Sequence, residues 1–533
     1  PAQLGYTLAC IYISMKESST AEYLVLYNAR VITMEPEQPE AELVAIRGNK
    51  ILDTGSNDDL EYFKRTNTNI INCDGKTVVP GFNDAHCHPL GFATHMLSVD
   101  CSPSAAGSIA GLQARLGERA MQTPEGRWIK ATGYNEFYLA EKRHPNRWDL
   151  DMSVPRHPVK LSHRSGHACV LNSPALQLAG ISIETPEPPG GIIERDLETG
   201  EPNGLLFGMN SFVEKLIPPV SEKEIEEAFR LANQEYLSHG ITSLQDASWT
   251  DSYKRWQRFH RLKERRELTP RLSMMIGVEE IEDFRERGLS MWSGNSQLQL
   301  GGVKIIVQMT TGSLDPPEEE LNRLASKAHE AGFQLAFHVV EESTLEASIA
   351  ALEHLLQRIP RTQHRHRIEH CSVCPPQLAQ RLKSTGAMVV TQPPFIYYSG
   401  ERYLATVPQD DLRWLYPIGS LLGEGIEVAA SSDSPVVPFD PLIGIYAAVT
   451  RKAETGQVLL PHEGISGSEA LRMYTLSAAY ASFEEKSKGS IVAGKLADLV
   501  VLSGDPTRIP PEEIKDIQAS MTIIDGEVVW ERD

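Results

Sequence analysis

Short apolar runs of β-strand type open and close the chain. Near the N-terminus they cover residues 22–27, 29–33, 42–46 and 50–53, and Gly48-Asn49 supplies a turn between the last two. Near the C-terminus they cover residues 497–502, 519–524 and 527–530, with the hairpin signal Asp525-Gly526. The pattern predicts a small β-sandwich built from both chain ends, over residues 1–80 plus 487–533.

The second half of the chain alternates between helical patterns and apolar strands. Ser221 and Glu224 form a capping box, and Gly240 ends that helix before a strand at 241–246. Asp315 before Pro316 is expected to open another helix, which Gly332 closes. Further strands are expected at 334–340, 367–371, 388–392 and 427–432, with helices from about residues 344, 376 and 410.

With the apolar runs at 77–79, 272–276 and 302–307, the count of strands reaches eight. Strands and helices at this spacing predict βα units and a parallel sheet, and eight units favour a closed (β/α)8 TIM-like barrel over an open, doubly wound sheet. Neither a G-x-G-x-x-G loop nor a Walker loop supports the open alternative. The predicted class is therefore α/β, with the barrel over residues 81–486.

Residues 100–215 do not follow this alternation. They are rich in proline and glycine and include Pro-Glu-Pro-Pro-Gly-Gly at 186–191. We interpret them as an insertion after the first barrel strand, and loops at the carboxyl ends of barrel strands face the catalytic mouth. The sequence thus predicts a lid-like insertion over a pocket.

Composition narrows the class of protein. The chain has 533 residues, 41% of them hydrophobic, and a formal net charge of −20 with no basic stripe, which argues against a nucleic-acid partner. No run approaches the roughly 20 apolar residues that cross a bilayer. We therefore expect a globular protein without a nucleic-acid or membrane partner, and base rates make a homodimer the expected assembly.

The cysteines and the N-terminus bear on the compartment. Seven cysteines are too sparse, and odd in number, for a disulfide framework, so a reducing, cytoplasmic location is expected. Residues 1–14 lack a basic segment and a cleavage site, which disfavours a secretory signal. We expect them to be an extension without a role in the fold, with Met15 as a candidate natural start.

Candidate chemistry is concentrated in residues 80–88, Pro-Gly-Phe-Asn-Asp-Ala-His-Cys-His. In an extended chain, His86 and His88 project to the same side and can bind one metal ion; the alternative is a pair of solvated or core histidines. Further candidates stand in or just beyond strand-like runs, and strand ends of a barrel converge on one pocket. The predicted metal-binding residues are His86, His88, Lys304, His338, His370 and Asp433.

Two alternative roles are open for each of Lys304 and Asp433. Lys304 lies between apolar neighbours, where its pKa would fall; its amine either pairs with Asp433 or Glu341, or adds CO2 to become a carbamate that bridges two metals. Asp433, in Ser-Ser-Asp-Ser-Pro, either caps a loop or helix or takes a proton from a metal-activated water.

These residues resemble the amidohydrolase superfamily over nearly the whole chain. The 80–88 segment matches its strand-1 metal motif, and Gly-Ser-Ile-Val-Ala-Gly-Lys-Leu-Ala-Asp-Leu-Val-Val-Leu at 489–502 matches its return to the β-sandwich. The segment 166–176, together with Arg-Ile-Glu-His at 367–370, is similar to the branch of N-substituted formamide deformylases, of amidohydrolase 3 type.

The resemblance implies a zinc-type hydrolase that cleaves a C–N amide-type bond. His86, His88 and Asp433 would hold one ion and His338 and His370 the other, with carboxylated Lys304 as the bridge. Asp433 would act as general base and acid for metal-activated hydroxide. The ligand types also suit manganese, iron or cobalt, with one or two ions. Candidate substrate-binding residues are His163, His167, Gln392 and Tyr397, although His163 and His167 could instead stabilise the insertion.

One departure and two alternatives remain open at the level of sequence. The branch often carries Asp-Gly shortly after the strand-4 lysine, where this chain has Gln-Met-Thr-Thr-Gly at 308–312, which bears on the substrate class. Glu341, three residues after His338, fits a mononuclear deaminase in which it shuttles protons, but it also fits a helix start. A non-catalytic scaffold is a third class, and such relatives usually lose ligands that this chain keeps.

Overall fold

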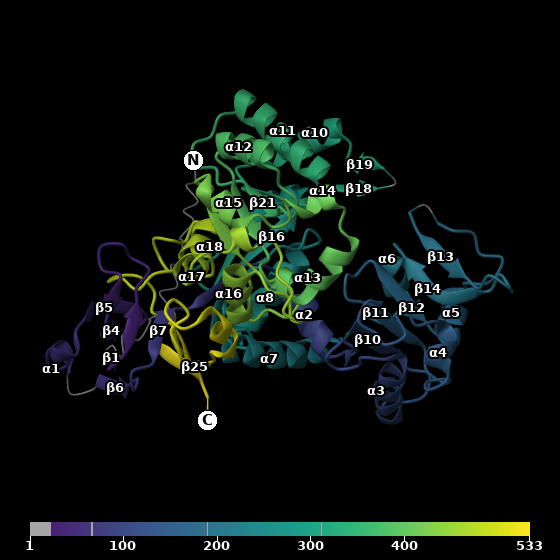
Figure 1. The fold of residues 1–533 in the computed structure, drawn as a ribbon, viewed down its shortest axis with the longest axis horizontal. Coiled ribbons are helices and arrows are strands. Elements are labelled where there is room, and N and C mark those ends of the chain that lie inside the picture. Colours follow the sequence, from purple (N-terminus) through teal and green to yellow (C-terminus); the bar gives the residue numbers. More distant parts are fainter. Residues whose placement is uncertain (1–22, 65–67, 189, 311, 533) are drawn as a thin grey trace, which may run out of the picture.

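The computed structural model describes residues 23–64, 68–188, 190–310 and 312–532. The extension expected at residues 1–14, and with it Cys10, lies outside these ranges. The chain forms a central barrel with a β-sandwich at one end and the insertion at the other (Figure 1). No helix among the described residues is long and apolar enough to cross a membrane.

Eight parallel strands form the barrel, in the order β23-β22-β21-β20-β17-β16-β15-β8. Their bounds are β8 (Phe82–Cys87), β15 (Ile241–Asp246), β16 (Arg271–Gly277), β17 (Leu298–Ile306), β20 (Leu335–Val339), β21 (Arg367–His370), β22 (Met388–Thr391) and β23 (Val428–Ala430). The sheet closes just beyond its last strand, because the amide of Asp433 donates to the carbonyl of His86 at 2.8 Å. The predicted (β/α)8 class is confirmed.

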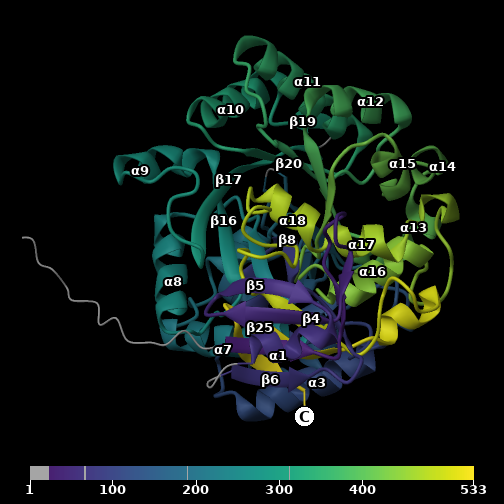
Figure 2. The ribbon, with the colours of Figure 1, turned by 90° about the vertical axis from the view of Figure 1, so that its left-hand side faces the viewer.

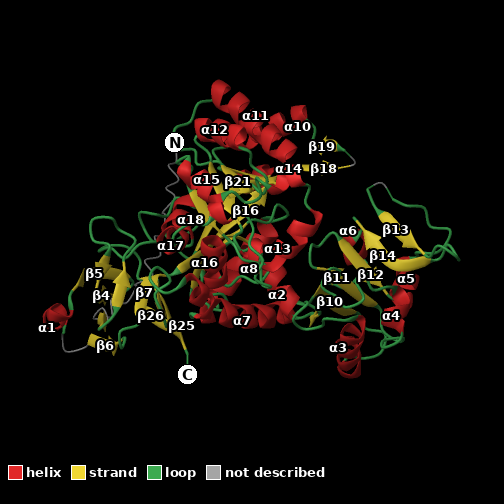
Figure 3. Ribbon diagram, in the orientation of Figure 1, coloured by secondary structure: helices red, strands yellow, loops and turns green. Residues whose placement is uncertain are grey.

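Helices surround this sheet (Figures 2 and 3). They are α2 (Pro89–Met96), α7 (Glu222–Ser238), α8 (Tyr253–Glu264), α9 (Ile281–Glu286), α10 (Glu318–Glu330), α11 (Glu342–Arg358), α12 (Pro376–Thr385), α13 (Pro394–Thr406), α14 (Gln409–Leu412), α15 (Ile418–Gly423), α16 (Pro441–Thr450), α17 (Gly467–Met473) and α18 (Leu476–Ala481). The capping box of Ser221 and Glu224 begins α7 as predicted, and Gly240 follows it with a φ of 74°.

The first barrel strand is not the run at 77–79, so that prediction is wrong. Residues Thr77–Pro80 form β7, which pairs with sandwich strands, and the barrel begins only at Phe82. Both faces of β7 are buried, because Val78 packs into the sandwich core while Val79 packs against the barrel. A continuous apolar run marks a strand buried on both faces and does not reveal which sheet it joins.

Two helix starts also differ from the predictions. Asp315 ends a short hairpin of β18 (Gln308–Thr310) and β19 (Ser313–Asp315), and the following helix α10 starts at Glu318. The helix expected from about residue 410 is the four-residue α14, and the longer α13 precedes it. The pattern missed α13 because its Pro393-Pro394 start and its four tyrosine and phenylalanine residues do not give a clear amphipathic repeat.

The sandwich combines the two chain ends. One sheet is β5-β4-β1-β6, and the other is β26-β25-β24-β7-β2-β3. Their bounds are β1 (Tyr23–Tyr27), β2 (Arg30–Ile32), β3 (Glu40–Ala41), β4 (Leu43–Arg47), β5 (Lys50–Gly55), β6 (Thr68–Asn72), β24 (Leu499–Leu502), β25 (Ala519–Ile524) and β26 (Glu527–Glu531), with the short helix α1 (Leu60–Phe63) before β6. Side chains from both sheets share one buried core.

The insertion has a sheet and a core of its own. Its strands run in the order β13-β14-β12-β11-β10-β9. The elements are β9 (Val99–Asp100), α3 (Ile109–Gln122), β10 (Ile129–Tyr134), α4 (Arg147–Asp151), β11 (Val159–His163), β12 (Ala168–Leu171), α5 (Ser173–Ala179), β13 (Ile192–Arg195), β14 (Pro202–Phe207) and α6 (Asn210–Glu214). It meets the barrel at α13, where Arg164 and Tyr138 both donate to the carbonyl of Tyr398.

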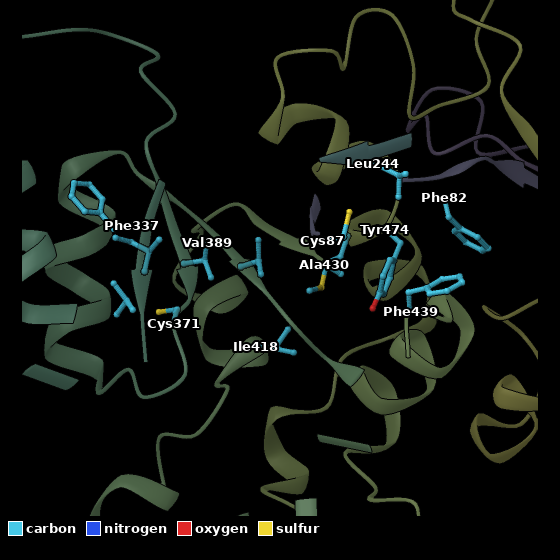
Figure 4. Packing of buried hydrophobic residues seen from close by; sticks show 14 of the residues in the cluster. Phe82, Cys87, Leu244, Phe337, Cys371, Val389, Ile418, Ala430, Phe439 and Tyr474 are labelled. Atoms are coloured by element: carbon cyan, nitrogen blue, oxygen red, sulfur yellow. The ribbon is translucent and has the colours of Figure 1, made fainter. Parts of the chain in front are cut away.

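The barrel core is continuous with the packing of its outer helices. Phe337 and Val389 come from barrel strands, Ile418 and Tyr474 from or beside the surrounding helices, and all are buried in one cluster (Figure 4). Burial of this kind contributes about 25 cal/mol per Å² of apolar surface. The core therefore fixes the strand ends from which the candidate site projects.

A buried ion pair joins the barrel to the sandwich. Arg271, the first residue of β16, donates to both oxygens of Asp498 at 2.6 and 2.9 Å and to Asp525 at 2.6 Å. Its side chain and that of Asp498 are almost fully buried, whereas Asp525 is 29% exposed. The nearby carboxylates outweigh the desolvation of the guanidinium and hold the pKa of Arg271 above its ordinary value.

We expect Asp498→Ala to lower the free energy of unfolding by about 3 kcal/mol, because it leaves a buried guanidinium short of one counter-charge. Asp525→Ala, at the half-exposed partner, should cost about 1 kcal/mol or less. Guanidinium unfolding followed by tryptophan fluorescence measures both. Equal losses for the two variants would contradict the role given to burial.

Candidate metal centre

His86 is held by a charged network behind it. It lies near the end of β8 with 1% of its surface exposed, and its Nδ1 lies 2.5 Å from the carboxylate of Glu369. Arg367 donates to both oxygens of Glu369, at 2.6 and 3.1 Å. The hydrogen-bond network therefore assigns the ring proton to Nδ1 and leaves Nε2 unprotonated, as in the histidines that ligate metals.

Lys304 meets His86 from across the barrel. It projects from β17, is 3% exposed, and its Nζ lies 3.3 Å from Nε2 of His86. Burial lowers the pKa of Lys304 to about 8, although the carboxylates of Glu369 and Asp433 act in the opposite direction. An amine with a lowered pKa has a larger neutral fraction near neutral pH, which is the form that reacts with CO2.

His338 and His370 form the opposite side of the site. Nε2 of His370 lies 2.9 Å from Nδ1 of His338, and Nδ1 of His370 lies 2.8 Å from the amide oxygen of Gln392. Gln392 is itself fixed, because its amide nitrogen donates to Ser431. Burial is the main cause that lowers the pKa values of His86, His338 and His370, so these imidazoles are neutral and able to ligate a cation.

Asp433 connects these groups to His88. Its Oδ1 lies 3.1 Å from Nε2 of His88 and 3.5 Å from Nε2 of His86. Burial alone would raise the pKa of Asp433, but the hydrogen bond with His88 and the proximity of the imidazoles of His86 and His370 outweigh it and hold the pKa below its ordinary value. The carboxylate is therefore ionised and can act as a ligand or accept a proton.

A second chain of hydrogen bonds orients His88. Its Nδ1 lies 2.8 Å from the hydroxyl of Ser248, and that hydroxyl donates to buried Asp246 at 2.6 Å. Since the serine proton is engaged by Asp246, the serine oxygen accepts from Nδ1 of His88, and this bond holds the ring with Nε2 toward Asp433.

Two of the candidate ligands have left-handed backbones. The φ angles are 68° at His370 and 59° at Asp433. Non-glycine residues adopt this region at a cost of about 1 to 3 kcal/mol and do so where surrounding structure imposes it, often at functional sites. Glu369, the residue before His370, already contacts His86 inside the barrel, so regular alternation would point His370 outward, and the left-handed turn brings it inward to His338.

The donor set fits a divalent metal. His86, His370 and Asp433 each offer one ligand atom, and these atoms lie within 4.8 Å of one another. Two neutral imidazoles and an ionised carboxylate are the ligands that zinc and related ions prefer. His88, Lys304 and His338 lie directly beside this group, so the structure brings together all six residues predicted as ligands.

The two histidines of the insertion differ in placement. His163 ends β11 and is occupied within the insertion, with Nε2 2.9 Å from Glu136 and Nδ1 2.7 Å from Ser165. Its hydrogen bond is the main cause that lowers the pKa of Glu136 to about 2. His167 is exposed, on the turn between β11 and β12, and its amide donates to the hydroxyl of Ser165.

The remaining candidates lie outside the group of six. Gln392 is fully buried behind His370, with both ends of its amide engaged, so it orients a ligand instead of facing the pocket. Tyr397 packs on Tyr398 and Tyr446, on the side of α13 toward α16. Glu341 is exposed at the start of α11, where the hydroxyl of Thr344 donates to its carbonyl and carboxylate oxygens, as is typical of a helix N-terminus.

Sequence reasoning missed the groups that orient the ligands. Glu369, Arg367 and Asp246 are fully or almost fully buried yet make charged contacts with or near His86 and His88. A signal for two of them exists, since Arg367 and Glu369 are two positions apart in a predicted strand and therefore share one face. Two charges on one face of a buried strand must be paired.

Comparisons with known proteins agree with this geometry. The family model described as the amidohydrolase family matches residues 69–530. The chain is 30% identical to the YtcJ protein of Bacillus subtilis, over 95% of this chain and 99% of that protein. It is 29% identical to the N-substituted formamide deformylase of Arthrobacter pascens, over 96% and 98% of the two chains.

A solved structure shares the fold. An uncharacterised metal-dependent hydrolase from Pyrococcus furiosus superposes with a TM-score of 0.72 at 23% identity, covering 91% of this chain and all of the other. The match of the family model over most of the chain, on a barrel whose rim gathers histidines, a buried lysine and an aspartate, shows that this chain belongs to the amidohydrolase family.

Proposed function

We propose that this metal-dependent hydrolase cleaves a C–N amide-type bond of a small molecule, with Asp433 as general base and acid. The observation that carries the proposal is the convergence of ionised Asp433 and the neutral imidazoles of His86 and His370 within 4.8 Å of one another. The deformylase named among the relatives acts on N-substituted formamides by its name, and this supports an amide-type bond.

We propose that His86, His88, His338, His370 and Asp433 hold the metal, with zinc as the expected ion. A bound divalent metal supplies Lewis acidity, which polarises a carbonyl oxygen and makes water acidic enough to react near neutral pH. We further propose that Lys304 is carboxylated, because its buried amine lies 3.3 Å from His86, where an anionic ligand would replace an unfavourable cation. A carboxylated lysine provides two oxygens, which allows a second ion.

The chain's own residues account for the proton transfers. Asp433 accepts a proton from the attacking water and delivers it to the leaving nitrogen, and its contacts with His88 and His86 hold its carboxylate beside the reacting groups. The Ser248–Asp246 chain keeps His88 in one orientation while this happens. We propose that His167, on the insertion, contributes to substrate binding.

The rim also suggests the character of the substrate. Three exposed apolar side chains follow the carboxyl ends of barrel strands: Trp249 after β15, Met309 after β17 and Val340 after β20, with exposures of 57%, 37% and 38%. An exposed tryptophan beside a polar centre is typical of a site that binds an apolar group. We therefore propose an amide that carries an apolar substituent, with the insertion closing over it.

The deaminase alternative depends on Glu341. Its contacts with Thr344 at the start of α11 fit a helix cap, and among the described residues it makes no hydrogen bond or ion pair with the six candidate ligands. This supports Asp433 over Glu341 as the proposed acid–base group.

We expect Asp433→Asn to reduce turnover by about 10²-fold or more, because the amide cannot accept the proton. The test uses a panel of N-substituted formamides and other small amides, with circular dichroism to verify folding. Asp440→Asn is the control, since that partly buried aspartate caps α16 through Leu442 and lies outside the site. Unchanged turnover in Asp433→Asn would remove Asp433 as the base.

Lys304→Ala should lower the metal content per chain, and a short carboxylic acid added during reconstitution should restore part of it by replacing the carbamate oxygens. Lys488→Ala is the control, because Lys488 is another buried lysine but binds Ser243 and Glu484 away from the ligands. Plasma mass spectrometry gives ions per chain after chelator treatment and reloading. Full metal content and full activity in Lys304→Ala would count against a ligand role.

Trp249→Ala should raise KM for amides with apolar substituents by about tenfold and leave kcat for the smallest amides nearly unchanged, since it removes binding surface and not reacting groups. Trp292→Ala is matched in exposure, at 54%, but Trp292 lies before β17, where its amide donates to the carbonyl of Leu300, away from the rim. Equal effects of the two variants would exclude Trp249 from the substrate site.

A further inference from the structure

A cavity lies between the insertion and the barrel. Its volume is about 470 Å³, and its walls come from α2, α3, β10, β11 and the segment that joins α6 to α7. Pro435, two residues beyond Asp433, forms part of one wall, but none of the six candidate metal ligands lines the cavity. The cavity is therefore separate from the metal centre and adjoins it.

The cavity carries a surplus of positive charge on an acidic protein. Four cationic side chains line it, namely those of Arg119, Arg127, Lys130 and Lys160, against the two carboxylates of Glu214 and Glu224. The formal surplus is two positive charges, whereas the whole chain carries −20. Glu224 is further engaged by Ser221 at the start of α7, so it does not neutralise a lysine.

Two lysines stand directly opposite each other on the cavity wall. Lys130 of β10 and Lys160 of β11 are partners in the parallel register, a placement that is unfavourable for like charges. Lys160 is 4% exposed, and both ammonium groups contact the single carboxylate of Glu214, at 2.5 Å from Lys160 and 3.2 Å from Lys130. One carboxylate neutralises one of the two charges and leaves the other available to an anion.

Hydrogen-bond donors extend this pair along the same face. Thr132 and Ser162 face each other two positions further along, on the same face of the sheet as the lysines, and both line the cavity. Within the described residues neither hydroxyl has a hydrogen-bond partner, and the guanidinium of Arg127 also makes no hydrogen bond or ion pair there. Cations beside free hydroxyl donors are the groups that bind carboxylate and phosphate oxygens.

We propose that this cavity binds a small molecule that carries a carboxylate or phosphate group. Lys130 and Lys160 neutralise the anion, and the hydroxyls of Thr132 and Ser162 donate to its oxygens. Ser162 directly precedes His163, and Pro435 lies two residues beyond Asp433. The bound anion would therefore lie next to the metal centre without contacting the residues that bind the metal. The proposal does not depend on which bond the metal centre cleaves.

Anion binding to the cavity can be tested by isothermal titration calorimetry of the metal-loaded protein. Inorganic phosphate and succinate are titrated separately at constant ionic strength. We expect saturable binding of one anion per chain, and the tighter of the two identifies the preferred oxyanion. Lys130→Gln and the double variant Thr132→Val/Ser162→Ala should each weaken binding at least about tenfold, since each removes charge-assisted contacts without a large change in volume.

Two controls separate this site from others. Lys383→Gln changes an exposed lysine on α12 and should leave the dissociation constant unchanged. His338→Asn disturbs the metal centre and should also retain anion binding. Absence of saturable binding by the unaltered protein, equal affinity in the cavity variants, or loss of binding in His338→Asn would overturn the proposal; the last result would place the anion at the metal centre.

Discussion

Closure of the barrel at the carbonyl of His86 is the contact on which the rest of the site depends. The amide of Asp433 donates to that carbonyl at 2.8 Å, and the side chain of Asp84 accepts from the amide and hydroxyl of Ser432. These bonds join the first barrel strand to the segment after the last. Without them, the candidate ligands of the two chain regions would not face one another.

Burial and hydrogen bonds together set the protonation states and the orientations of the candidate metal-binding residues. Burial alone lowers the pKa values of the histidines and would raise that of Asp433, which favours neutral forms throughout. Hydrogen bonds to Glu369, Ser248 and Gln392 direct each imidazole, and the surrounding histidines keep Asp433 ionised. Glu369, Ser248 and Gln392 therefore orient the candidate metal-binding residues, and the protonation states of those residues set the charge of the site.

The sequence was sufficient for the architecture and for the candidate ligands, for a physical reason. Helix caps such as Ser221, apolar runs and strand-end histidines are local signals, and barrel closure gathers strand ends whatever their separation in the chain. It was insufficient where the role of a residue or strand depends on which partner it pairs with in the fold. The run at 77–79 reads as a buried strand, yet only the fold shows that it pairs within the sandwich. Gln392 likewise reads as a pocket residue but lies behind His370.

Anomalous X-ray diffraction at the absorption edge of the bound metal, on crystals of protein purified without chelators, is the most direct test of the central claim. We expect a peak within coordination distance of His86, His370 and Asp433. Crystals soaked in zinc that show no peak among these three residues, or a peak only elsewhere on the molecule, would contradict it.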